Sequence, residues 1–368
     1  MSRFQTLREE VRRRQRAARR VATTVALDAM GTDHGPEELL QGAYEALEAL
    51  PLVTVIATGP RAHLEALIAK RGWRHPRLQV EDATEVVGMD ELPKDSLRKE
   101  NSSISVAARL VAQGRAGGLV SAGNTGATMA AVIRHWRRLP GISRPAVSAH
   151  IPHPKHPCIF LDVGANVDCR PRHLLDFAIM GHVYAHYMFH RRNPRVGLLS
   201  IGEEDIKGNE QTLAAQQLLR SVPLNFCGNA EGRDLFLGKF DVVVCDGFVG
   251  NVLLKFGEGL VEFVFDHLKA EVRRNALSQL GALAMMPVFR SFKKMIDASE
   301  YGGAPLLGLN GTCIICHGSS QAKSIRNAIR VAADFAGAKI NQHIVQVAAK
   351  VHEALARPTG EAAGGVAG

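Results

Sequence analysis

Residues 119–130 read LVSAGNTGATMA, and this run joins an apolar strand to a helix through a glycine-rich turn. The same succession of strand, turn and amphipathic helix recurs along the chain from Thr23 onward. Strands are predicted at residues 24–27, 52–58, 119–121, 158–163, 195–201, 241–245 and 313–317. Strands that alternate with helices predict a mainly parallel sheet with helices on both faces, a three-layer α/β/α architecture.

Several of these strands are apolar throughout instead of alternating between apolar and polar residues. Such strands are expected where helices cover both faces of a parallel sheet. In open α/β sheets, ligands bind at the carboxyl ends of the strands. The residues that directly follow each predicted strand are therefore the candidates for a functional site.

The charge of the chain is concentrated at its N-terminus. Lys and Arg number 45 against 36 Asp and Glu, which gives a net charge of +9, and eight arginines fall within the first twenty residues. A block of like charges usually stays solvated, so residues 1–22 are predicted to be a flexible basic extension. Attraction to anionic lipid, nucleic acid or an acidic partner is the alternative, and the chain as a whole is not predicted to bind nucleic acid.

The sequence predicts a cytoplasmic protein. No run approaches the roughly 20 apolar residues that span a bilayer, and the N-terminus lacks the apolar centre of a secretory signal. The six cysteines lie mainly in apolar, strand-like runs, which is typical of buried thiols in a reducing compartment.

Residues 23–353 are predicted to form the α/β domain, and residues 354–368 a disordered tail. Between about 271 and 296 the pattern changes to a helical hairpin broken by Pro287. The hairpin is predicted to contact a second subunit or, since cations border its apolar face, an anionic membrane surface. The residues expected to make this contact are Leu280, Met285, Phe289 and Phe292.

The turn after the first strand contains Asp28, Asp33 and His34. Pro36 suits the first turn of a following helix, whose free amides could hold an anion. The alternative is an ordinary strand-to-helix turn in which Asp33 and His34 cap backbone amides.

The turn in residues 121–127 is the clearest candidate for a phosphate site. Ser121, Gly123, Thr125 and Gly126 place hydroxyls and free amides at the start of a helix, where a phosphate is well accommodated. The pattern is neither a Walker loop nor a dinucleotide fingerprint, so nucleotide binding is not predicted. Asn124 could donate a hydrogen bond to a carbonyl oxygen as negative charge develops on it.

Two further candidates follow the next strands. Asp162 and Asn166 bracket a turn whose acidic residue lacks the His or Cys partners of a metal site, so turn building or helix capping is the favoured interpretation. Lys207 follows the strand in residues 195–201, where an ammonium could offset charge on phosphate or on an oxyanion; the alternative is a solvated surface lysine.

Asp246 and Asn251 follow the strand in residues 241–245, and Lys255 lies in the apolar run beyond them. This arrangement could place Asn251 beside a wall that is apolar enough for an acyl chain.

The last strand ends at His317, which could move a proton, and Ser319 and Ser320 follow it, where they could bind phosphate or cap the next helix. No serine stands in a nucleophile elbow and no cysteine has a paired histidine at a recognised spacing, so a covalent acyl-enzyme is not predicted.

Seven short motifs, in this order, closely resemble those of the bacterial phosphate acyltransferase family. They occupy residues 28–34, 121–127, 161–166, 207–210, 245–251, 301–304 and 317–320. The resemblance extends from about residue 25 to 333, and the chain departs from the family pattern at Thr32, where a second glycine is common.

The resemblance implies transfer of a long-chain fatty acyl group from acyl carrier protein to inorganic phosphate. The acyl phosphate would feed glycerol-3-phosphate acylation in phospholipid synthesis. It also implies a homodimer with a fold similar to phosphotransacetylases and isopropylmalate dehydrogenases, peripheral association with the inner face of the membrane, and contact with the glycerol-3-phosphate acyltransferase. Neither a metal nor an organic cofactor is expected.

The resulting hypothesis is direct attack of bound phosphate on the thioester. The amides of residues 121–127, with Ser319 and Ser320, would hold phosphate, so that positioning makes the main contribution to the rate. Lys207, Asn251 and Asn124 would stabilise the oxyanion, and His317 would manage the proton.

Two other functions are weighed against this one. A nicotinamide-dependent hydroxyacid dehydrogenase would need an aspartate cluster or a dinucleotide fingerprint, neither of which is evident in the sequence. A non-catalytic acyl-chain or carrier-binding module would bind carrier protein without phosphate-dependent turnover.

Overall fold

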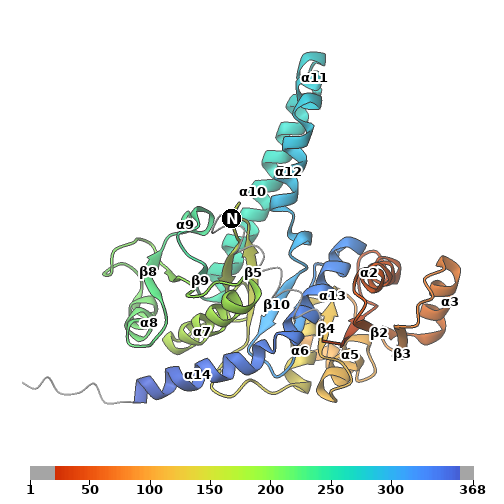
Figure 1. Cartoon of the computed structure of the whole chain (residues 1–368), viewed down its shortest axis with the longest axis horizontal. Coiled ribbons are helices and arrows are strands. Elements are labelled where there is room, and N and C mark those ends of the chain that lie inside the picture. Colours follow the sequence, from red (N-terminus) through yellow and green to blue (C-terminus); the bar gives the residue numbers. More distant parts are fainter. Residues whose placement is uncertain (1–20, 357–368) are drawn as a thin grey trace, which may run out of the picture.

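The computed structural model describes residues 21–356, in which the strands form one sheet with helices on both faces (Figure 1). The strand order is β3-β2-β1-β4-β11-β10-β5-β6-β9-β7-β8. The strands are β1 (Thr23–Asp28), β2 (Val53–Gly59), β3 (Leu78–Asp82), β4 (Gly118–Ser121), β5 (Ala146–Ile151), β6 (Cys158–Leu161), β7 (Val196–Leu199), β8 (Phe226–Ala230), β9 (Val242–Val244), β10 (Ala304–Leu307) and β11 (Cys313–Ile315).

The helices connect these strands in the alternation that the sequence predicts. They are α2 (Pro36–Ala49), α3 (Arg61–Arg71), α4 (Pro93–Ser96), α5 (Ser103–Ala112), α6 (Thr125–His135), α7 (Pro171–Met188), α8 (Glu210–Arg220), α9 (Asp234–Leu237), α10 (Gly247–Arg273), α11 (Ala276–Ala284), α12 (Met286–Ile296), the 3₁₀ turn η1 (Ala298–Glu300), α13 (Ala322–Gly337) and α14 (Ile340–Ala356). The predicted basic extension and C-terminal tail lie almost wholly outside the described residues, although residues 354–356 still belong to α14.

Each of the seven predicted strand runs contains a strand, and β3, β5, β8 and β10 are additional. β3 and β8 form the two edges of the sheet and are only partly buried, so their sequences lack a continuous apolar run. β5 and β10 are the strands that join the two halves of the sheet by antiparallel pairing.

The two halves of the sheet run in opposite directions. Strands β3, β2, β1, β4 and β11 are mutually parallel, and so are β6, β9, β7 and β8. Between the halves, β11 is antiparallel to β10, β10 to β5, and β5 to β6. The sheet is thus mainly parallel, but the carboxyl ends of β1, β4 and β11 lie at one edge, here named the first edge. Those of β6, β7 and β9 lie at the opposite, second edge.

Residues of β1 show how both faces of the sheet are covered. Val25 and Leu27 pack in one cluster with residues of α2 and α13, whereas Ala26 packs with residues of α5. Successive side chains of a strand point to opposite faces, so α2 and α13 lie on one face and α5 on the other. Burial on both sides explains the continuous apolar strands.

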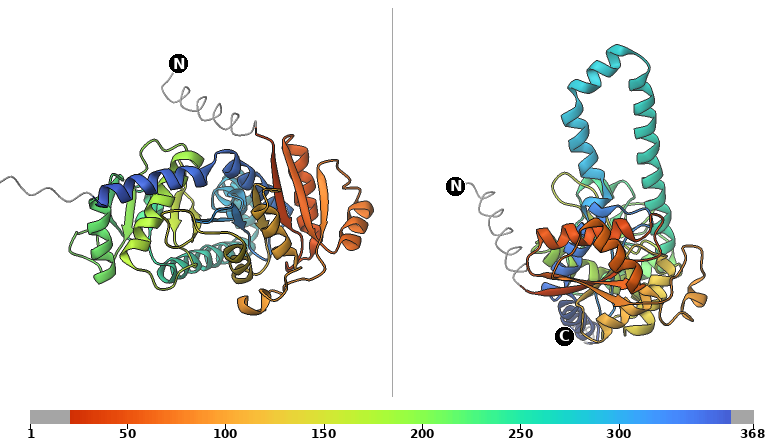
Figure 2. Two further views of the ribbon diagram at one scale, coloured as in Figure 1. Left: turned by 90° about the horizontal axis from the view of Figure 1, so that it is seen from below. Right: turned by 90° about the vertical axis from the view of Figure 1, so that its right-hand side faces the viewer.

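A helical hairpin projects from this body, with α10 as one arm and α11 and α12 as the other (Figure 2). The predicted hairpin, residues 271–296, covers the second arm but misses most of the first, because α10 begins at Gly247, directly after β9. Pro287 lies in the first turn of α12, where a missing amide hydrogen costs nothing. Among residues 21–356, no helix is both long and apolar enough to cross a bilayer.

Candidate functional site

The directions of the strands divide the predicted site residues into two sets, one at each edge of the sheet. The first-edge set follows β1, β4 and β11. Its centre is the carboxylate of Asp28, which accepts a hydrogen bond of 2.8 Å from the Ser121 hydroxyl. Both side chains are buried. The Ser121 oxygen in turn accepts the amide of Gly123 at 3.2 Å, so this hydroxyl builds the turn, in contrast to the predicted contact with phosphate.

Asp28 titrates far from its ordinary range. Burial raises the pKa of this carboxyl from 3.8 to about 6, although hydrogen bonds from Ser103, Ser121 and the amide of Met30 oppose the rise. The Ser121 hydroxyl that donates to this carboxyl is the same group that accepts the amide of Gly123, so Asp28 belongs to the hydrogen-bond network of the turn.

Asn124 is fully engaged in structure. Its side-chain amide donates at 2.9 Å to the carbonyl oxygens of Met89 and Glu91, and its oxygen accepts the amide of Ala127 as the N-cap of α6. These bonds use the donor that the oxyanion role requires, so Asn124 positions the 88–91 loop against α6. Thr125, the next residue, is exposed at the start of α6.

The loop after β11 completes the first-edge set. His317 and Ser319 are exposed and joined by a hydrogen bond of 2.7 Å between Nδ1 and Oγ. Asp33 donates its amide to the carbonyl oxygen of Gly318 at 3.2 Å. The start of α13 is already occupied by a carboxylate, because the amide of Ala322 donates to Glu38 at 2.7 Å.

The remaining members of the first-edge set are more peripheral. His34 is exposed and Ser320 is half-buried. Gly126 packs against Pro93, whose Cγ would lie 2.8 Å from a β-carbon at position 126.

The second-edge set is built around Asp162, which is wholly buried directly after β6. One carboxylate oxygen accepts the amides of Val147 and Ala165 at 3.0 and 3.1 Å, and the other accepts both the backbone and side-chain amides of Asn166 at 2.7 and 2.9 Å. Burial raises the pKa of Asp162, and these hydrogen bonds oppose the rise. The carboxylate thus organises the turn, as the favoured interpretation of the sequence has it.

Helix α10 starts against this turn. Asp246 caps it by accepting the amide of Val249 at 2.9 Å, and Gly247 donates its amide to the carbonyl oxygen of Asn166 at 2.7 Å. Asn251 lies close to Gly164, so its exposed side chain stands beside the turn. Lys255, in contrast, is exposed and paired with Glu258 at 2.8 Å, which differs from the predicted role of shaping the site.

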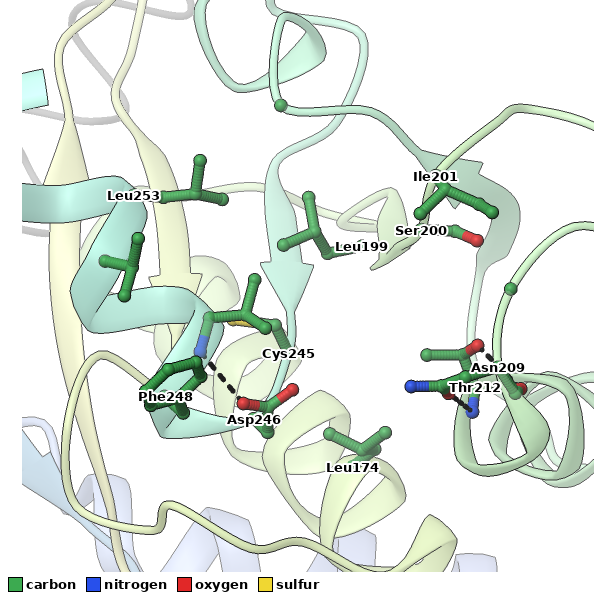
Figure 3. A pocket seen from close by; sticks show the side chains of 14 residues that line it. Leu174, Leu199, Ser200, Ile201, Asn209, Thr212, Cys245, Asp246, Phe248 and Leu253 are labelled. Carbon is green, nitrogen blue, oxygen red and sulfur yellow. Dashed lines mark hydrogen bonds between the residues drawn. The ribbon is translucent and has the colours of Figure 1, made fainter. Parts of the chain in front are cut away.

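An apolar pocket of about 500 Å³ opens beside Asp246 (Figure 3). Side chains after β9 and on α10 face those after β7 and on α8 across it. Its wall is mainly apolar, with Asp246 on the α10 side and Ser200, Asn209 and Thr212 on the facing side. The lining residues are Leu174, Leu199, Ser200, Ile201, Gly208, Asn209, Thr212, Gly232, Cys245, Asp246, Phe248, Val249, Val252 and Leu253.

Lys207 precedes the part of this lining that belongs to α8. Its side chain is exposed, and its carbonyl oxygen accepts the Ser200 hydroxyl at 3.2 Å. Asn209 caps α8 by accepting the amide of Thr212 at 2.9 Å. The positive, N-terminal end of α8 therefore lies on this side of the pocket, two residues after Lys207 in the chain.

Several residues that line the pocket were not predicted as site residues from the sequence. The capping role of Asn209 could have been predicted, since asparagine directly before an amphipathic run is a typical helix cap. Leu174 carries no such signal, because it enters the pocket from α7, which belongs to a different strand–helix unit.

The described part of the chain, residues 21–356, contains no group of three or more His, Cys, Asp or Glu side chains that could hold a metal ion. The pocket instead combines an apolar cavity with the side-chain amide of Asn209 and the hydroxyls of Ser200 and Thr212, and Lys207 directly precedes this part of the lining. Such a site can bind an apolar chain and place an anion at its end.

The chain is similar to known proteins over most of its length. Residues 23–343 match the family model described as fatty acid synthesis protein. The phosphate acyltransferase of Heliobacterium modesticaldum is 52% identical over 309 residues, which cover 84% of this chain and 92% of that protein. That of Moorella thermoacetica is 50% identical over 311 residues, 84% of this chain and 91% of that protein.

Solved structures support the fold. A phosphotransacetylase from Streptococcus pyogenes has a TM-score of 0.62 at 17% identity and covers 90% of this chain and 98% of its own. The EutD phosphotransacetylase from Staphylococcus aureus has a TM-score of 0.58 at 16% identity, and the match covers 88% of this chain and 98% of that protein. From its sequence and its fold together, this chain belongs to the fatty acid synthesis protein family, with the phosphate acyltransferases, and is an acyltransferase enzyme.

Proposed function

We propose that this acyltransferase takes a long-chain fatty acyl group from acyl carrier protein and gives acyl phosphate, which a glycerol-3-phosphate acyltransferase then uses in phospholipid synthesis. The observation that carries the proposal is the pocket beside Asp246. Its 500 Å³ volume is within the range of ligand pockets. Its apolar wall suits an acyl chain, and its polar rim suits the thioester and phosphate.

The reaction is a direct displacement. A phosphate oxygen forms a bond to the acyl carbon, the carbon–sulfur bond breaks, and the thiolate of the carrier leaves with the electron pair. Lys207, which directly precedes Gly208 and Asn209 of the pocket lining, and Asn251, which lies on α10 beside Gly164, are the donors assigned to the oxyanion of the tetrahedral intermediate. The arrangement requires no covalent acyl-enzyme, because phosphate itself is the nucleophile.

Two places compete for phosphate. One is the second edge, where the exposed Lys207 shortly precedes the start of α8. The other is the first edge predicted from the sequence, where Thr125, His317 and Ser319 are exposed. We favour the second edge, since it adjoins the pocket. A rise in the KM for phosphate in Lys207→Ala but not in Thr125→Ala/Ser319→Ala supports that choice, and the reverse supports the first edge.

The hairpin serves assembly in this proposal. Phe256, Leu260 and Phe263 form an exposed apolar stripe on α10, with exposed fractions of 67%, 49% and 66%. A second copy of the chain covers this stripe in a homodimer. The tip around Leu280 and Met285, exposed by 65% and 50%, contacts the inner face of the membrane. Phe289 is half-buried, and the ring of Phe292 stacks on that of Phe265 at 6.0 Å between centroids.

The test is release of free thiol from palmitoyl-acyl carrier protein with and without inorganic phosphate, with acyl phosphate trapped by hydroxylamine. Phosphate-dependent release with trapped product is expected. Phosphate-independent release would make the protein a thioesterase. Binding of carrier protein without release would make it a binding module, and either result would overturn the proposal.

A further inference from the structure

One long segment of the chain is purely basic in its charges. No Asp or Glu stands between Glu100 and Asp162. Within this segment, residues 133–145 combine four arginines with one histidine, and they lie at the carboxyl end of α6 and in the loop that leads to β5.

The structure folds these residues around a hollow of about 780 Å³. Trp136 holds the loop in place, because its ring is buried and its indole nitrogen donates to the carbonyl oxygen of Ala108 at 2.9 Å. Arg134, Arg137 and Arg138 line the hollow, and Arg144 lies exposed between the lining residues Ser143 and Pro145. These four residues are named the arginine face below.

The arginine face is only partly neutralised by the chain itself. Arg134 pairs with Glu100 at 2.6 Å, and Arg138 donates to the carbonyl oxygen of Ser143. Arg137 and Arg144 are exposed, and within residues 21–356 their guanidinium groups have no hydrogen-bond or ion-pair partner. Clustered cations without counter-charges attract an anionic partner and steer its approach.

The arginine face adjoins the second-edge set. The side chain of Asn166 donates to the carbonyl oxygen of Pro145 at 2.7 Å, which ties the loop to the turn of Asp162. Burial raises the pKa of the nearby Cys169 thiol to about 12, the carboxylates of Asp162 and Asp246 add to the rise, and the Arg144 guanidinium opposes it. Arg144 therefore acts electrostatically on the same neighbourhood as Asp246, at the rim of the pocket.

We propose that the arginine face is the docking surface for the acidic protein that carries the acyl thioester. The inference rests on the proposed function, because it supplies the place from which a protein-bound donor reaches the pocket. A carrier seated there holds its prosthetic arm beside the turn of Asp162 and Asn166. The acyl chain can then enter the pocket while the carrier stays outside.

The position of the face argues for a protein partner and against lipid. Helix α6 lies in the α/β body, whereas α11 forms the far end of the projecting hairpin (Figure 1). A membrane that contacts the hairpin tip would not reach the end of α6. A concave surface also suits a folded partner better than a flat bilayer.

The decisive variant is Arg137→Glu/Arg144→Glu, tested with two donors. One donor is acyl carrier protein loaded with an acyl chain, and the other is an uncharged pantetheine thioester of the same chain. Charge reversal is expected to raise the KM for the carrier-bound donor about tenfold or more, since like charges then face each other. It should leave phosphate-dependent cleavage of the small thioester unchanged. The matched control is Lys70→Glu/Arg74→Glu, which makes the same change in net charge at exposed positions near β3.

Added salt distinguishes the wild type from the reversed variant. The apparent affinity of the wild-type enzyme for the carrier should fall with ionic strength, and that of the variant should fall less. An unchanged KM for carrier-bound donor would overturn the docking surface, as would an equal loss with both donors. Loss of binding to anionic vesicles with an unchanged carrier KM would assign the face to lipid. If the wild-type enzyme cleaves neither donor in a phosphate-dependent way, the proposed function itself fails.

Discussion

Gly250 of α10 packs directly on the backbone of Asp162, so closely that a β-carbon at position 250 would overlap the Asp162 carbonyl oxygen. The contact joins the first arm of the hairpin to the turn that follows β6. The same helix carries Asp246 and Asn251 at its start. The first arm of the hairpin and part of the pocket lining therefore belong to one continuous helix.

Gly250→Ala should separate α10 from this turn. The added methyl group has no room, and overpacking of this kind typically costs about 1–3 kcal/mol. Acyl phosphate formation should fall together with the urea midpoint of unfolding. Gly257→Ala is the matched control on the same helix, because no atom lies within 4 Å of the place that its new methyl group would take. It should stabilise the helix by about 0.5–1 kcal/mol. Equal behaviour of the two variants would contradict the close contact.

Asp28→Asn should change how stability depends on pH. The folded pKa of Asp28, about 6, lies above its ordinary value of 3.8. Between these values the folded state binds more protons than the unfolded state, so this group lowers the free energy of unfolding as pH rises from about 4 to about 6. The full effect is about 3 kcal/mol at 1.36 kcal/mol per pKa unit. Urea unfolding of wild type and variant across this range measures it, and parallel curves would show that Asp28 is not the group responsible.

Lys207→Ala should lower acyl phosphate formation by about 100 to 1,000-fold, the usual effect of removing one oxyanion donor. Stability should stay close to that of the wild type, since the side chain is exposed. Hydroxylamine trapping measures the product. Lys70→Ala, also at an exposed lysine, is the control for loss of one positive charge. Activity within about threefold of wild type would remove Lys207 from the proposed mechanism.

Gly232→Leu should shift the preference of the enzyme toward shorter acyl chains. Gly232 lines the pocket, and the nearest atom to a β-carbon there is the Leu253 Cδ2 at 3.9 Å. A leucine side chain would therefore extend into the cavity and occupy the space that we propose for the acyl chain. The measurement is kcat/KM for a series of donors that differ only in chain length. A uniform decrease across the series would place the acyl chain elsewhere.

Charge substitutions should separate the two proposed functions of the hairpin. Leu277→Glu/Leu280→Glu, at the tip, should abolish flotation with anionic liposomes and leave the dimer intact. Phe256→Glu/Phe263→Glu, on the α10 stripe, should yield monomers in sedimentation. If the tip variant also became monomeric, the tip would belong to the subunit interface instead.

The local pattern of the sequence was sufficient for the individual strand–turn–helix units. Each predicted strand run contains a strand, and Asp162 has the turn-building role that the sequence predicts. Asp246 caps α10, a role that was not predicted. These roles depend on backbone groups within a few residues, so they can be read locally. The long α10 was harder to predict, since its apolar residues before 271 are equally typical of a buried helix.

The grouping of the site residues could not be predicted in this way. The motifs after β4 and β11 and those after β6 and β9 look alike as sequence, yet they lie at opposite edges of the sheet. The reason is the antiparallel pairing of β10 and β5, which are far apart in the chain and carry no distinctive pattern. The role of Asn124 could not be predicted either, because the carbonyl groups of Met89 and Glu91 that accept its side-chain amide come from another loop.

By itself, the sequence determined the fold class, the family and the turns of the site, because apolar periodicity, glycine placement and capping residues act over short distances along the chain. Only the tertiary structure decided which turns share an edge, where the pocket opens, and that the loop of residues 133–145 is tied to the turn of Asp162 and Asn166. Those relationships depend on the direction in which distant strands pair, and strand direction is set by packing of the whole sheet.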